Sequence, residues 1–210
     1  MEKLIIKQRE IKDEDEIEKI RKACQIADEC LTEIVKIIKV GQTEKEIAFK
    51  IEFWLKEKSC DLSFYPIVAI DKNSSLPHYS TKDGEGKVKK NSIILIDFGA
   101  KFQDYHSDIT RMIFVGEQSN EIINVYRKLL EAQTKTVKRL KIDNNPVSID
   151  QFCRQLLTFN FKLSTYSHST GHGVGLQIHE YPKISLSSFL EDSLSPTSSR
   201  NHIVNGTIPP

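Results

Sequence analysis

The stretch HSTGHGVGLQIHEYP, residues 168–182, places three histidines within twelve positions and interleaves them with three glycines. Glycine lets a backbone approach a ligand closely and adopt positive φ, so the segment GHGVG is suited to presenting His172. Because imidazole titrates near neutral pH and binds metals, His168, His172 and His179 are candidate metal ligands or proton carriers. A single histidine is more often a surface or hydrogen-bonded core residue, but three histidines beside glycines are harder to explain in that way.

Two aspartates lie in apolar, strand-like runs in the middle of the chain. Asp97 stands in IILIDFG and Asp108, eleven residues later, in HSDITRMIF. A buried carboxylate needs a compensating charge or hydrogen bond, and a hairpin would bring both acids to one face. Such a pair suits manganese, magnesium or iron-like ions rather than a thiolate-bound zinc. Spacing alone leaves a second interpretation equally open, in which Asp97 ends its strand in a turn and Asp108 pairs with Arg111.

Hydrophobic periodicity predicts the elements around these motifs. Apolar residues recur every three or four positions over 13–40, which indicates a long amphipathic helix with a capping box at Asp13 and Glu16. The same start signal precedes a second helix over 43–58. The remaining segments are predicted as strands at 64–70, 92–100 and 107–116, a polar loop at 71–86, and helices at 119–140 and 148–160 with N-caps Ser119 and Ser148.

The overall composition is that of an ordinary globular protein. With 210 residues, 39% of them hydrophobic, the chain can bury one substantial core in one or two domains. The formal net charge of +1 gives no electrostatic argument for a nucleic-acid or membrane partner. The N-terminus lacks the apolar core of a signal peptide, and no apolar run reaches the roughly 20 residues that span a bilayer. We therefore expect a cytoplasmic protein whose four cysteines are reduced and mostly buried.

Three motifs follow one another at characteristic separations: NSSLPHYS (73–80), LIDFGAKFQDYHSDITR (95–111) and HSTGHGVGLQIHEYP (168–182). In this order they resemble the creatinase, prolidase and methionine aminopeptidase superfamily of metallopeptidases, especially its Xaa-Pro aminopeptidase and Xaa-Pro dipeptidase branch. The resemblance extends from about residue 11 to 184. It implies an α+β architecture called the pita-bread fold, in which helices flank a curved antiparallel sheet with the active site in its concave face.

The resemblance also implies a two-metal centre. Asp97, Asp108 and His172 correspond to metal ligands, with Asp108 bridging the ions. The implied cofactor is a pair of divalent ions, manganese foremost, with cobalt or zinc as alternatives. In the family a metal-bridging water or hydroxide attacks the peptide carbonyl, and the two ions increase its acidity.

Three further histidines acquire roles from the same resemblance. His78 and His179 correspond to catalytic residues that orient the substrate and stabilise the tetrahedral intermediate by hydrogen bonding. His168 corresponds to a residue lining the proline-accepting pocket. The histidine-rich stretch is therefore expected to be a wall of the active site.

The resemblance is incomplete toward the C-terminus. Family members complete the metal site with two further glutamates, one of them in a TIEPG-like strand, whereas this sequence ends in NGTIPP with Pro209 in place of that glutamate. More than half of residues 185–210 are Ser, Thr, Asn or Pro, so we expect a catalytic domain over 1–184, incomplete at its C-terminal end, and an irregular tail over 185–210. Three ligands are too few for two ions; truncation, a frameshift and a natural short form are alternative explanations.

The expected function is metal-dependent release of an N-terminal residue that precedes proline. The expected partners are peptides with proline in second position, and a homodimer is an assembly that this function allows. An alternative is a catalytically inactive pita-bread module that binds peptides or proteins, which the missing glutamates favour. Retention of all six candidate residues favours the enzyme. The motifs SDITR and HSTGHGVG disfavour a methionine aminopeptidase because they match the proline-specific branch.

Overall fold

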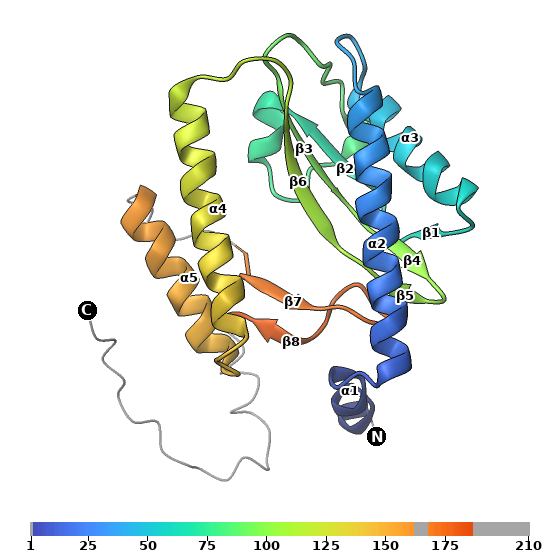
Figure 1. Cartoon of the computed structure of the whole chain (residues 1–210), viewed down its shortest axis with the longest axis vertical. Helices are drawn as coiled ribbons and strands as arrows, with labels where there is room; N and C mark the ends of the chain where they lie inside the picture. Colours follow the sequence, from blue (N-terminus) through green and yellow to red (C-terminus); the bar gives the residue numbers. More distant parts are fainter. Residues whose placement is uncertain (1, 162–167, 187–210) are drawn as a thin grey trace. The chain divides into compact units, whose positions relative to one another are not determined.

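The computed structural model describes residues 2–161 and 168–186, and Figure 1 shows how their elements follow one another. Two compact units are present, one made of the described residues up to 130 together with 172–182, the other of the remaining described residues. No helix in these described ranges is both long and apolar enough to cross a membrane. The predicted tail lies almost entirely outside the described residues, so the division at residue 184 stays a prediction.

Three helices begin the first unit: α1 (Glu2–Glu10), α2 (Glu14–Ile37) and α3 (Glu44–Glu57). Both predicted capping boxes are confirmed. The Asp13 side chain accepts from the Glu16 amide at the start of α2, and the Thr43 side chain does the same at the start of α3. Helix α1 was not predicted, because its apolar side chains are exposed and form no buried stripe.

The central sheet of the first unit contains β2 (Ile67–Ile70), β3 (Ile93–Phe98) and β6 (Ile109–Phe114), in the order β2-β3-β6. Every neighbouring pair is antiparallel, which confirms the predicted pairing of the segments around 92–100 and 107–116. Strand β2 begins later than predicted, and β3 and β6 are shorter than predicted at both ends. The register pairs Asp97 with Thr110 across β3 and β6.

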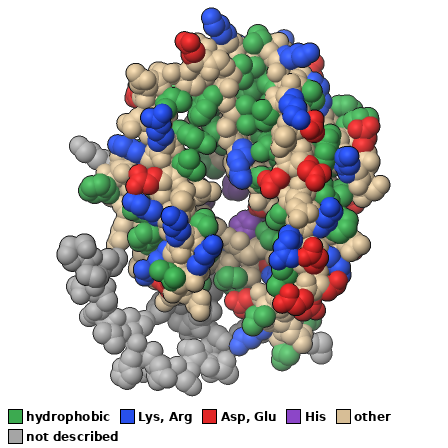
Figure 2. All heavy atoms as spheres, viewed as in Figure 1, with side chains coloured by type: hydrophobic (Ala, Val, Ile, Leu, Met, Phe, Trp, Pro, Cys, Tyr) green, Lys and Arg blue, Asp and Glu red, His purple; other side chains and the backbone are tan. Residues whose placement is uncertain are grey.

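The two faces of this sheet differ in burial. Alternate residues of β3, such as Ile94 and Ile96, are fully buried and join α2, α3 and β2 in one hydrophobic core. The intervening residues, among them Leu95 and Asp97, are half-buried on the other face. Figure 2 shows hydrophobic side chains gathered over β3 and β6, with histidine side chains next to them. The period of two in β3 therefore directs Asp97 away from the core.

A small second sheet interrupts the predicted hairpin. It contains β1 (Asp61–Leu62), β4 (Ala100–Phe102) and β5 (Tyr105–His106), in the order β1-β4-β5. Gly99 joins β3 to β4, and a Cβ at this position would overlap the carbonyl oxygen of Ser107. Only glycine permits so close an approach of two backbones at this junction.

The segment predicted as a polar loop contains two short 3-10 helices, η1 (Asp71–Ser75) and η2 (Thr81–Asp83). His78 lies between them. The two helices predicted after residue 118 are present as α4 (Asn120–Leu140) and α5 (Pro146–Phe161). Strands β7 (Gly171–Gly173) and β8 (Glu180–Ile184) pair with each other and were not predicted.

The predicted helix caps have different outcomes. At α4 the hydroxyl of Ser119 accepts from the amide of Ile122, as expected. At α5 the prediction of Ser148 is wrong, because the Asn145 side chain accepts from the amides of Val147 and Ser148. Helix α5 consequently begins at Pro146, whose missing N–H is harmless in the first turn.

Candidate metal centre

Asp97 is held on the half-buried face of the central sheet by its partner strand. The hydroxyl of Thr110, directly opposite on β6, donates to Asp97 Oδ1 at 2.9 Å. Strand β3 continues one residue further, to Phe98. The alternative interpretation, in which Asp97 ends its strand in a turn, is therefore wrong.

Asp108 lies immediately before β6, on the same side of the sheet as Asp97. Thr110 of β6 is paired with Asp97 of β3. Asp108 precedes Thr110 by two residues, so its side chain lies on the same face of the sheet as those of Thr110 and Asp97. Burial raises the pKa of Asp97 to about 6, and the neighbouring charge and hydrogen bond of Asp108 add to this increase. Asp108 therefore lies close enough to oppose ionisation of Asp97.

His172, on β7, faces Asp108. Its Nε2 lies 3.4 Å from Asp108 Oδ2, and its Nδ1 lies 2.9 Å from the carbonyl oxygen of Gly173. The hydrogen bond to Asp108 raises the pKa of His172 above its ordinary value, although burial opposes the increase. Arg111, the alternative partner of Asp108, instead donates to the carbonyl of Thr110.

Two more histidines complete this cluster. The rings of His172 and His179 are in edge contact, with centroids 4.4 Å apart. Burial lowers the pKa of His179, and the positive charge of His172 lowers it further. His78 lies near enough for its charge to lower the pKa values of both Asp97 and His179. Five of the six predicted residues thus converge from separate segments of the first unit.

His168 belongs to the second unit. Its Nδ1 lies 2.8 Å from the carbonyl oxygen of Ser169, and its own carbonyl accepts a hydrogen bond from Arg154. Its role in a proline pocket stays a prediction.

The cluster has the chemistry of a divalent-cation site but an incomplete set of ligands. Two mutually repelling carboxylates and an imidazole are ligands that manganese and related ions accept. Within residues 2–161 and 168–186, however, no three His, Cys, Asp or Glu side chains are arranged to enclose an ion. Asp97, Asp108 and His172 therefore fit a metal in kind, and further ligands would be needed to complete its coordination.

Glu180 is held by two basic residues near the N-terminus, which were not among the predicted site residues. Arg9 donates to Glu180 Oε1, Lys12 Nζ lies 2.9 Å from Oε2, and the Gln177 amide donates at 2.9 Å. Burial alone would raise the pKa of Glu180, but these partners lower it below its ordinary value. No local sequence pattern indicates this contact, because it joins residues about 170 positions apart.

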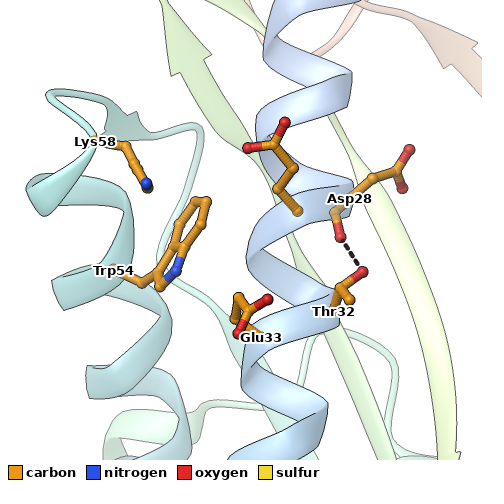
Figure 3. Close-up of a pocket in the computed structure, with 6 residues that line it drawn as sticks. Asp28, Thr32, Glu33, Trp54 and Lys58 are labelled. Atoms are coloured by element: carbon orange, nitrogen blue, oxygen red, sulfur yellow. Dashed lines mark hydrogen bonds between the residues drawn. The ribbon is translucent and has the colours of Figure 1, made fainter.

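A surface groove elsewhere on the first unit does not coincide with the histidine cluster. It lies between α2 and α3 and is lined by acidic residues of α2, including Asp28 and Glu33, and by Trp54 and Lys58 of α3 (Figure 3). Lys58 Nζ lies 5.3 Å from the centroid of the Trp54 ring. None of the six predicted site residues lines this groove.

Known proteins resemble this chain over most of its length. The chain is 36% identical over 176 residues to a Xaa-Pro dipeptidase of Pyrococcus horikoshii, covering 83% of this chain and 50% of that protein. It is 38% identical over 184 residues to an uncharacterised peptidase of Staphylococcus aureus, covering 87% and 52% of the two chains. The chain thus spans about half the length of the curated relatives it matches.

Solved structures resemble the chain over the same half. An X-Pro aminopeptidase from Thermotoga maritima superposes with a TM-score of 0.81 at 37% identity, covering 89% of this chain and 53% of that one. The predicted α+β pita-bread fold is confirmed by this likeness. The sequence model of metallopeptidase family M24 matches residues 18–203. From the extent of that match, the chain belongs to the metallopeptidase family M24.

Proposed function

We propose that this chain carries the metal-binding face of a peptidase that releases an N-terminal residue preceding proline. The observation that supports this most strongly is the convergence of Asp97, Asp108 and His172 on one region, beside His78 and His179. The names of the relatives, Xaa-Pro dipeptidase and X-Pro aminopeptidase, support proline in the second position of the substrate.

Asp97, Asp108 and His172 would hold the divalent ions in this proposal, with manganese as the expected metal. Such ions, when bound, lower the pKa of a bound water and so supply the nucleophile. His179 has a lowered pKa and is therefore neutral at pH 7, where it donates one N–H to the oxygen that becomes negative. His78, whose charge acts on both Asp97 and His179, orients the substrate in this proposal.

The proposal also includes a catalytic domain over residues 1–184 and a substrate-binding role for His168. His168 would line the pocket for the proline ring. A cytoplasmic location and a homodimer belong to the same proposal, and size-exclusion chromatography with light scattering tests the dimer. Because the described ligands are too few for two ions, we expect the 210-residue chain alone to hold at most one ion weakly and to turn over slowly.

The alternative of an inactive binding module has less support. All five clustered residues have acid–base or metal-binding side chains, and the relatives reported above are named as peptidases. A module that only binds peptides has no need to keep two carboxylates within repelling distance on a half-buried face.

Manganese binding provides a test that does not depend on turnover. Isothermal titration with Mn²⁺ should show binding to the wild-type chain and its loss in Asp97→Asn and Asp108→Asn. Asp28→Asn, which removes an exposed carboxylate from the groove in Figure 3, is the matched control and should bind as wild type does. Equal binding by all four proteins would show that the ion is held elsewhere.

The substrate class is tested on the same preparations. In the presence of Mn²⁺, release of alanine from an Ala-Pro peptide should exceed release of methionine from Met-Ala-Ser. Cleavage of the methionine peptide alone would replace the proposed specificity with that of a methionine aminopeptidase. Cleavage of neither peptide by a protein that binds Mn²⁺ through Asp97 and Asp108 would favour the binding module.

A further inference from the structure

Glu44 is a charged side chain enclosed in the core of the first unit. It stands in the first turn of α3, directly after the N-cap Thr43, and its exposed fraction is 0%. An acidic residue in the first turn of a helix is usually exposed, where it interacts with the helix dipole. Removing a carboxylate from water is unfavourable unless hydrogen bonds replace its hydration. The burial of Glu44 therefore depends on the donors around it.

Four donors satisfy this carboxylate, and all come from segment 70–86, which begins at the last residue of β2 and leads toward β3. Oε1 accepts from the Ile70 amide at 2.7 Å and from Asn73 Nδ2 at 2.9 Å. Oε2 accepts from the Tyr79 hydroxyl at 2.7 Å and from the Gly86 amide at 3.0 Å. Segment 70–86 is thus tied to one side chain at its start, its middle and its end.

The backbone of this segment approaches the carboxylate closely. A Cβ on either Gly84 or Gly86 would overlap the carboxylate oxygens of Glu44. Burial and the hydrogen bond to Glu44 raise the pKa of Tyr79 to about 12, so its hydroxyl stays protonated and continues to donate. Segment 70–86 is therefore folded around Glu44 rather than merely touching it.

His78 lies inside this segment in a conformation that needs support. Its φ is +56°, in the left-handed region that residues with a Cβ rarely adopt. The next residue, Tyr79, bonds to Glu44, and Asn73 donates both to Glu44 and to the Tyr79 oxygen, the latter at 2.8 Å. The backbone is thus restrained on both sides of His78 by contacts that meet at one carboxylate.

We propose that Glu44 is a positioning residue of the candidate metal centre, whose buried carboxylate shapes segment 70–86 and thereby holds His78 beside Asp97. This inference rests on the proposed function where its readout is peptide hydrolysis. Among the described residues, no hydrogen bond joins the Glu44 side chain to Asp97 or to the clustered histidines, and Glu44 acts only through the backbone that carries His78.

A second anchor makes the role of Glu44 separable from folding of the sheet. The Asp71 carboxylate accepts from the Ser92 hydroxyl at 3.0 Å and from the Ile93 amide at 2.9 Å, which fastens the start of η1 to β3. Loss of Glu44 should therefore loosen the part of the segment around His78 while β2 and β3 stay paired.

Glu44→Gln is the informative variant, because it keeps the volume and replaces one doubly accepting oxygen with an NH₂ group that cannot accept. Ile47→Val, one turn along α3 and equally buried, is the matched control for a general loss of stability. By hydrogen exchange, amides of segment 70–86 should exchange at least tenfold faster in Glu44→Gln, with smaller changes elsewhere. Unchanged exchange of this segment, or a uniform increase equal to that in Ile47→Val, overturns the inference.

Hydrolysis of an Ala-Pro peptide by the full chain with Mn²⁺ provides a second measurement. Loss of stability alone would not produce the pattern of kcat and KM values expected here. Glu44→Gln should lower kcat about tenfold with little change in KM, and it should have no further effect once His78→Ala is present. Effects of Glu44→Gln and His78→Ala that multiply would show that Glu44 does not act through His78.

The two proposals fail in distinguishable ways. A wild-type chain without Xaa-Pro hydrolysis contradicts the proposed function, whereas hydrogen exchange of segment 70–86 still decides the role of Glu44. If Glu44→Gln does not fold, Tyr79→Phe removes one of the four hydrogen bonds and should give smaller changes in the same direction. Wild-type exchange in Tyr79→Phe would then contradict the inference.

Discussion

Replacing Glu180 with glutamine removes the charge that joins the N-terminal segment to the turn carrying His179. The Glu180 side chain is only 5% exposed, and its partners Arg9 and Lys12 are 28% and 13% exposed. Removing one member of a buried charge cluster leaves the other charges without compensation and costs about 3 kcal/mol. We therefore expect Glu180→Gln to unfold at a urea concentration about 1 M lower than wild type at pH 7, given typical denaturant slopes.

The assay is urea unfolding followed by the fluorescence of Trp54, the single tryptophan, which lies in the same unit as Glu180. Glu33→Gln is the control, because Glu33 forms an exposed pair with Lys36 whose loss should change stability by about 0.5 kcal/mol or less. If Glu180→Gln loses no more stability than Glu33→Gln, the cluster around Glu180 does not stabilise the fold.

The pH dependence supplies an independent check. The pKa of Glu180 is lowered in the folded protein, so the folded state binds its proton more weakly than the unfolded state. The stabilisation is therefore complete above the unfolded pKa of about 4.3 and declines as the pH falls through the lower folded value. The stability difference between wild type and Glu180→Gln should shrink in that acidic range. A difference that stays constant from pH 7 down to pH 3 would refute the assignment to this charge.

Three further predictions concern other parts of the chain. The carboxylate of Asp150 is fully buried and accepts from Arg154 Nε at 2.8 Å. Asp150→Asn should therefore lower the stability of α5 by about 3 kcal/mol, measured by hydrogen exchange of that helix. Exchange at the wild-type rate would contradict this. Gly99→Ala should destabilise the first unit by about 3 kcal/mol in urea unfolding, because its Cβ would overlap a neighbouring backbone carbonyl; wild-type stability would show that the backbone adjusts freely. A thiol reagent at pH 8 should label exposed Cys24 before buried Cys30, since burial raises the pKa of Cys30 to about 12. Mass spectrometry that shows early labelling at Cys30 would contradict its burial.

Local patterns were sufficient for much of the first unit. The capping boxes at Asp13 and Thr43 are confirmed because cap and helix lie within four residues, so their chemistry is complete in the sequence. The pairing of β3 with β6 followed from two apolar strands close together in the chain. The resemblance of three motifs indicated the family, and the comparisons confirm it.

Some local signals were misread or absent. The sequence pattern predicts Ser148 as a helix cap although Asn145 before Pro146 is an equally good start signal, and Asn145 is the cap in the structure. The hairpin β4–β5 was not predicted, because two strands of two or three residues produce no measurable alternation. The roles of the six predicted site residues stay predictions, although five of them lie together.

The main helices, the central strands and the family could be predicted because each depends on patterns within a few residues or on motifs that can be read directly. The folded structure was needed to show that Arg9 and Lys12 bind Glu180, and that Glu44 is buried beneath the segment bearing His78. A charged residue near a helix end has the same local pattern whether it is solvated or enclosed. What distinguishes the two is burial by segments tens or hundreds of residues away, which exists only once the chain has folded.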